Sequence, residues 1–167
     1  LFDYDRHNAL YFFILNGDEE IYLRYGGRDS VSPDSYLSLD SLELALQRGL
    51  ELHDQWKEGN GPAWEAPEPF YPEQMPLLQE KEVSRGRCVE CHMIGDYQAV
   101  QLELDGNLDK AKLMFPSPDL KKLGIELDVP KGLLVDAVSG MAEAAGLQPG
   151  DTIAGFEEHK VYTFGDL

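Results

Sequence analysis

The chain has 167 residues, of which 43% are hydrophobic, and this is enough for one ordinary domain or two small ones. Its formal net charge of -17 argues against binding to nucleic acid or to anionic lipid, because like charges repel. No apolar run approaches the roughly 20 residues that a membrane-spanning helix needs. The first residues show no initiator methionine and no signal peptide, so we expect a removed segment or a fragment.

The first 58 residues predict a β-hairpin followed by a helix. An apolar run at 9–15 meets an Asn-Gly-Asp turn at 16–18, and an alternating apolar and polar stretch follows. Leucine and alanine then recur at helical spacing up to about Lys57, and Asp40 or Ser41 is expected to cap this helix.

Residues 59–84 predict a proline-rich connector. Proline fixes the backbone angle φ and removes a hydrogen-bond donor, so an extended segment is expected there. A different segment follows at 85–115, and it contains a predicted short helix from about Tyr97 to Met114.

The segment 85–115 holds both cysteines of the chain, Cys88 and Cys91, with His92 directly behind the second. Attachment of haem c uses two thiols spaced to reach the two vinyl groups, and the next histidine binds the iron as the proximal ligand. The C-x-x-C-H stretch meets each of these requirements. We therefore expect one haem c on Cys88 and Cys91, with His92 on the iron.

Three other interpretations of the two cysteines stay open. A redox disulfide favours a helix N-terminus directly after a buried strand, and the polar, glycine-broken residues 82–87 argue against such a strand. Arg85 and Arg87 suit a thiolate and haem propionates equally well. Structural zinc needs four ligands, so His53 or His7 would have to complete the single pair. The last alternative is a pair of unmodified thiols.

The sixth iron ligand has two candidates. His53 lies near the end of the predicted amphipathic helix, where it could also be a surface residue that suits the helix dipole. Met114 is the second candidate, although a core methionine is the more common role. We expect His53 as the distal ligand and Met114 as the runner-up.

From Leu123 onward, short strands are predicted at 123–127, 132–138 and 152–156, with a short helix of small residues and a Pro-Gly-Asp turn before the last. This pattern resembles a PDZ domain of the bacterial HtrA-like kind. The resemblance implies that a partner's C-terminus adds as a strand while amides of Leu123, Gly124 and Ile125 hold its carboxylate. The chain ends where the second groove helix would begin, so we expect weak peptide binding and a packing role.

The first 58 residues also resemble the C-terminal half of a thioredoxin-like domain. The whole arrangement is similar to bacterial proteins that join a thioredoxin-like module to a C-terminal PDZ domain. No C-x-x-C precedes the hairpin, and no candidate for a cis-proline lies before its first strand. The resemblance therefore implies a scaffold without thiol chemistry in this region.

The expected fold is an α/β thioredoxin-like fragment at 1–58 and a mainly β PDZ-like domain at 116–167, joined by the connector at 59–84 and the haem-attachment segment at 85–115. The expected function is electron transfer by a single-haem subunit of a periplasmic or otherwise exported redox assembly, docked to protein partners through the PDZ-like part. No catalytic constellation can be named, so an enzyme is not expected. The alternative is a PDZ-containing adaptor with a structural or redox disulfide between Cys88 and Cys91.

Overall fold

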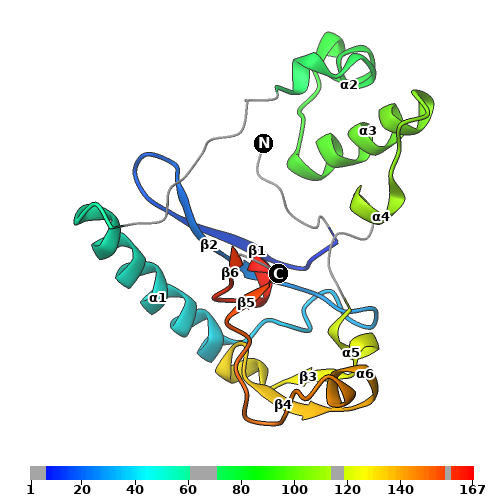
Figure 1. The fold of residues 1–167 in the computed structure, drawn as a ribbon. Coiled ribbons are helices and arrows are strands. Elements are labelled where there is room, and N and C mark those ends of the chain that lie inside the picture. Colours follow the sequence, from blue (N-terminus) through cyan, green and yellow to red (C-terminus); the bar gives the residue numbers. More distant parts are fainter. Residues whose placement is uncertain (1–6, 61–70, 114–118, 157–158) are drawn as a thin grey trace. The chain divides into compact units, whose positions relative to one another are not determined.

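A computed structural model describes residues 7–60, 71–113, 119–156 and 159–167 (Figure 1). These residues form two compact units. The small unit contains the described residues 71–113, and the large unit contains the rest. The predicted thioredoxin-like and PDZ-like parts thus both contribute to the large unit. None of the helices in the described ranges is long and apolar enough to cross a membrane.

The predicted hairpin of the large unit is confirmed. Strands β1 (Tyr11–Leu15) and β2 (Ile21–Gly26) pair antiparallel. The Asn16 side chain holds the turn between them, because its Oδ1 accepts hydrogen bonds from the backbone N–H of Asp18 at 2.9 Å and of Glu20 at 3.0 Å. This is the turn chemistry for which asparagine is favoured.

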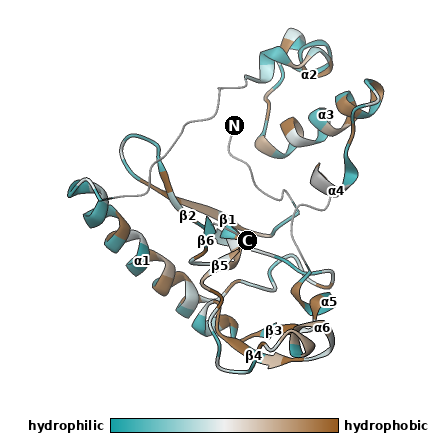
Figure 2. Ribbon diagram, in the orientation of Figure 1, coloured by the Kyte–Doolittle hydropathy of each residue, from teal (hydrophilic) through white to brown (hydrophobic). Residues whose placement is uncertain are grey.

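Helix α1 (Leu39–Lys57) follows the hairpin and begins after Ser38. The predicted cap at Asp40 or Ser41 is therefore wrong. Ser41 is buried, and its hydroxyl lies 2.8 Å from the Tyr25 hydroxyl, so it faces the hairpin instead of capping. Apolar and hydrophilic segments alternate along α1, as expected for a helix with one buried face (Figure 2). The core between α1 and the hairpin contains Tyr22, Leu23, Tyr25, Ala45 and Leu52.

The C-terminal part of the large unit contains short strands and a short helix, as predicted, but each of the predicted strands begins later than the sequence indicates, and Leu123 belongs to a helix. Its elements are α5 (Leu120–Leu123), β3 (Ile125–Leu127), β4 (Val135–Val138), α6 (Gly140–Ala144), β5 (Gly155–Phe156) and β6 (His159–Lys160). Across the described ranges the strands form three separate antiparallel pairs, β1 with β2, β3 with β4, and β5 with β6. The fold class expected from the sequence stays a prediction.

A second core of the large unit combines Tyr36, which precedes α1, with side chains of the C-terminal part. It contains Tyr36, Leu120, Leu133, Val161 and Phe164. The rings of Tyr36 and Phe164 stack with centroids 3.6 Å apart and planes 7° apart. Burial, together with the charges of Asp29 and Asp119, raises the pKa of the Tyr36 hydroxyl to about 12. Tyr36 therefore stays protonated at physiological pH.

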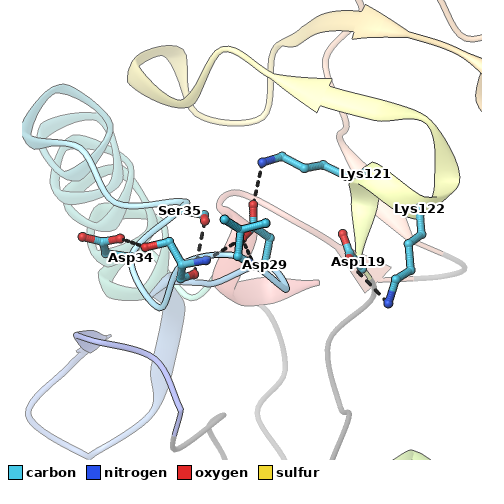
Figure 3. A network of polar contacts seen from close by, with 8 residues as sticks. Asp29, Asp34, Ser35, Asp119, Lys121 and Lys122 are labelled. Carbon is cyan, nitrogen blue, oxygen red and sulfur yellow. Dashed lines mark hydrogen bonds and ion pairs between the residues drawn. The ribbon is translucent and has the colours of Figure 1, made fainter.

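Asp29 ties the loop after β2 to α5 (Figure 3). Its buried carboxylate accepts hydrogen bonds from the backbone N–H of Val31 at 2.7 Å and of Ser32 at 2.9 Å, and from Lys121 Nζ at 2.6 Å. Burial alone would raise the pKa of Asp29, but these hydrogen bonds, Lys121 first, outweigh it and hold the pKa well below its ordinary value. Asp119 and Lys122 form a neighbouring ion pair at 3.5 Å.

The small unit is helical in its described residues. It contains α2 (Pro76–Lys81), α3 (Cys91–Leu104) and α4 (Lys110–Leu113). The predicted helix from about Tyr97 to Met114 is wrong in its bounds, because α3 begins earlier, at Cys91, and α4 is a separate helix. The core contains the buried residues Met75, Leu78 and Ile94, against which Val83, Val89 and Tyr97 pack.

Candidate functional site

The two cysteines lie at the N-terminal end of α3. Cys91 is the first residue of this helix, Glu90 is its N-cap, and Cys88 lies in the segment before it. Both thiols are exposed and free. Ile94, one turn further along α3, is buried in the core of the small unit. The helix is thus anchored through Ile94 while both thiols remain accessible to a reagent or cofactor.

His92 is the second residue of α3, and its imidazole is exposed. Its Nδ1 lies 3.4 Å from the Glu90 carboxylate. A carboxylate beside one ring nitrogen of histidine orients the ring and leaves the other nitrogen to bind a metal. The imidazole therefore offers Nε2, so His92 fits the role of proximal ligand that the sequence predicts for it.

A buried carboxylate holds the segment before Cys88 against α3. Glu82 is 7% exposed, and it accepts a hydrogen bond from the Tyr97 hydroxyl, while the Arg87 guanidinium lies 3.4 Å from it. The Glu82 carbonyl also accepts hydrogen bonds from the backbone N–H of Arg85 at 3.0 Å and of Arg87 at 3.2 Å. We call Glu82, Arg87 and Tyr97 the Glu82 cluster. It fixes the residue that precedes Cys88 to the middle of α3.

The electrostatics of the Glu82 cluster favour an ionised glutamate. The hydrogen bond from Tyr97, followed by the one from Arg87, lowers the pKa of Glu82 in spite of its burial. The same hydrogen bond raises the pKa of Tyr97. Sequence reasoning assigned Arg87 to a thiolate or to haem propionates and missed Glu82 and Tyr97. Local sequence patterns carry no signal for the contact between Glu82 and Tyr97, because these residues are 15 positions apart in the sequence.

Replacing Glu82 with glutamine is expected to destabilise the small unit at pH 7. The amide cannot supply the charge that Arg87 and Tyr97 contact. Because the folded pKa of Glu82 is lowered, its contribution is complete above the ordinary glutamate pKa and is lost as the pH falls through the folded value. The difference between the variant and the parent should therefore narrow in acid.

Urea-dependent hydrogen exchange of peptides from 71–113, at neutral and acid pH, measures this effect. The matched control is Glu80→Gln, which removes an exposed carboxylate that pairs with Lys81 at 2.7 Å. Equal effects of the two substitutions at pH 7 would contradict the assigned role of Glu82.

His53 lies on α1 in the large unit, whereas Cys88, Cys91 and His92 belong to the small unit. Its Nδ1 lies 2.8 Å from the Tyr22 hydroxyl, and its ring stacks on Trp56 with centroids 5.6 Å apart. The half-buried imidazole lines a mostly apolar cavity of about 400 Å³ together with Ile14 and Leu46. His53 thus has its ring held and Nε2 available, and distal ligation stays a prediction. Met114 lies outside the described residues.

The predicted carboxylate loop is part of the end of α5. Leu123 is the last residue of this helix, and the backbone N–H groups of Leu123 and Gly124 donate to the carbonyls of Asp119 at 3.4 Å and Lys121 at 3.1 Å. Gly124 has φ +84°, and a Cβ there would lie 1.9 Å from the Ser139 carbonyl oxygen, so glycine is required. Two of the three backbone N–H groups that were predicted to hold a peptide carboxylate thus already donate hydrogen bonds within the chain. Peptide capture at Leu123, Gly124 and Ile125 stays a prediction.

Over the ranges 7–60, 71–113, 119–156 and 159–167, no group of three or more His, Cys, Asp or Glu side chains is arranged to hold a metal ion. No family model matches the chain, and no curated protein or solved structure matches it significantly. The resemblances to PDZ and thioredoxin-like domains therefore stay predictions.

Proposed function

We propose that the chain is an electron-transfer subunit that carries one haem c on Cys88 and Cys91. The observation that carries the proposal is the donor set at the start of α3. Two exposed, free thiols lie beside an imidazole whose Nδ1 faces a carboxylate. When bound, haem supplies a one-electron iron couple. The residues fit this group because both thiols are accessible and His92 offers Nε2.

One cluster of side chains in the small unit supports attachment at the two thiols. The Glu82 cluster orders the segment that carries Cys88, so less conformational entropy is lost when the second thioether forms. These residues therefore position the thiol of Cys88 for attachment.

The proposed function implies a compartment and protein partners. The chain acts in a periplasmic or otherwise exported redox assembly, where haem c is attached, and its PDZ-like part packs against protein partners. The net charge of -17 supports a basic partner, because an acidic surface speeds the approach of a cation in a salt-dependent way.

The visible spectrum of the chain, produced in cells that mature c-type cytochromes, tests the proposal. The parent is expected to show the bands of a covalent haem, and His92→Ala should change these bands or remove them because the proximal ligand is lost. His159→Ala is the matched control, since His159 is an exposed histidine in β6 of the large unit. A colourless parent, or a His92→Ala spectrum identical to that of the parent, would refute the proposal.

His53 is the proposed distal ligand, with Met114 as the second choice. His53→Ala should turn a low-spin spectrum high-spin, because one strong-field imidazole is lost. Tyr22→Phe should act in the same direction but more weakly, since it removes only the group that holds Nδ1. A low-spin spectrum that survives His53→Ala, with a weak ferric band at about 695 nm, would instead indicate methionine ligation.

A second candidate function is a PDZ-containing adaptor with a disulfide between Cys88 and Cys91. One observation favours it: Cys91 lies in the first turn of a helix, the position that reactive cysteines favour. The segment before it contains a short 3₁₀ turn at Val83–Arg85 where the redox interpretation expects a buried strand. A colourless protein whose intact mass is about 2 Da below that of the dithiol would support this candidate.

A further inference from the structure

The large unit contains a mostly apolar cavity of about 460 Å³, a volume typical of small-molecule sites. It lies beside α1, the turn at Val129–Lys131 and residues 152–154 and 160–164. Its walls include the buried side chains of Leu133, Val161 and Phe164. Such walls favour an apolar ligand body, because burial removes the apolar surface of that body from water.

The charged residues that line this cavity, among those that the structure describes, are all basic. Arg48 of α1, Lys131 and Lys160 of β6 line it, and none of the described residues that line it is acidic. This is unusual for a chain that has 31 acidic and 14 basic residues. The Arg48 guanidinium lies over the Tyr162 ring, 4.5 Å from its centroid, so its position at the cavity is held.

Two of these cations already contact carboxylates. Arg48 lies 2.5 Å from Glu51, and Lys131 lies 2.6 Å from Asp128. Both pairs connect residues three positions apart at the surface, and surface pairs of this kind contribute little to stability. The two cations can therefore be shared with an incoming anion at low cost.

We propose that this cavity binds a medium-chain carboxylate such as a fatty acid. The apolar chain enters between α1 and the wall formed by Leu133 and Val161, and the carboxylate remains at the rim beside Arg48, Lys131 and Lys160. This site lies wholly in the large unit and is separate from the thiols of Cys88 and Cys91. It requires neither haem nor a disulfide, so it does not rest on the proposed function.

Calorimetric titration of the full chain with sodium decanoate tests the proposal, with decanol and decyltrimethylammonium as neutral and cationic probes of equal chain length. Decanoate is expected to bind at one site, at least about fivefold more tightly than decanol, which is the factor for one favourable unit charge about 4 Å away in water. This advantage should shrink as salt rises from about 20 to about 300 mM. No decanoate binding, or equal binding of the three probes, would overturn the proposal.

Variants locate the binding. Lys131→Gln with Lys160→Gln should weaken decanoate about fivefold or more and leave decanol unchanged, because only the charge at the rim is altered. Lys57→Gln is the matched control, since this exposed lysine pairs with Asp54 on α1 away from the cavity. A loss of decanoate affinity in the control equal to that in the double variant would overturn the assigned rim.

A blocking substitution tests the cavity itself. Ala154→Trp places a large ring at an exposed position on the wall and should abolish binding of both decanoate and decanol. Circular dichroism checks that the variant folds, and Leu44→Trp, at a 47% exposed position on the α1 wall, replaces it if it does not. Unchanged decanoate binding in a folded blocking variant would place the ligand elsewhere and overturn the proposal.

Discussion

Replacing Leu78 with alanine is expected to unfold the small unit while the large unit stays folded. Leu78 is fully buried at the centre of the core with Met75 and Ile94. A buried leucine truncated to alanine costs about 2–5 kcal/mol in free energy of unfolding. A helical unit of this size has little stability to spare, because small units bury a small fraction of their surface.

Hydrogen exchange of the chain without haem measures this effect. Peptides from α2 and α3 should lose protection in Leu78→Ala, whereas peptides from α1 serve as the internal reference. Val100→Ala is the matched control, because Val100 is 44% exposed on α3 and its truncation leaves no cavity. Unchanged protection of α3 in Leu78→Ala would show that the core around Leu78 does not hold the cysteine segment.

Replacing Asp29 is expected to destabilise the large unit strongly. Asp29→Ala leaves the backbone N–H groups of Val31 and Ser32 without their acceptor, and removes the carboxylate that Lys121 contacts. We expect a loss of about 3 kcal/mol in free energy of unfolding. Asp29→Asn keeps an oxygen for the two backbone donors but loses the charge and the second oxygen that accepts from Lys121, so it should cost less than Asp29→Ala, about 1.5 kcal/mol.

The pH dependence of this effect has a defined sign. The pKa of Asp29 is lowered in the folded protein, so its stabilisation is complete above the ordinary aspartate pKa and is lost as the pH falls through the folded value. The difference between parent and Asp29→Asn, followed by urea unfolding of the large unit, should thus shrink below about pH 4. A difference between parent and Asp29→Asn that is constant over this range would contradict the role assigned to the Asp29 charge, and equal losses for Asn and Ala would contradict the role of the hydrogen bonds from Val31 and Ser32.

Local sequence signals predicted the elements whose structure depends on neighbouring residues. The hairpin was predicted because Asn16 carries its own turn chemistry. The start of α1 was misplaced because Ser41 is a good capping residue whose hydroxyl is instead used by Tyr25, a partner that is distant in sequence. Secondary-structure propensity does not contain such tertiary contacts.

In the candidate site, too, local signals were predictable from the sequence and tertiary contacts were not. The spacing of Cys88, Cys91 and His92 predicted a chemistry, but it did not predict that Cys91 begins a helix. Gly95 lies inside α3 and lowers its intrinsic propensity, and packing of Ile94 against Leu78 compensates. Glu82 could not be predicted as a site residue, because its role depends on Tyr97, which reaches it only after α3 has folded.

Intact-mass measurement of the denatured chain, purified from cells that mature c-type cytochromes, distinguishes covalent haem from a dithiol and from a disulfide. The parent is expected to carry an added mass of about 616 Da, that of one haem held on both thioethers, and Cys88→Ala with Cys91→Ala is expected to carry none. Peptide mapping should place the added mass on the peptide that contains Cys88, Cys91 and His92. An unmodified parent mass, or one about 2 Da below that of the dithiol, would contradict the assignment of haem to this site.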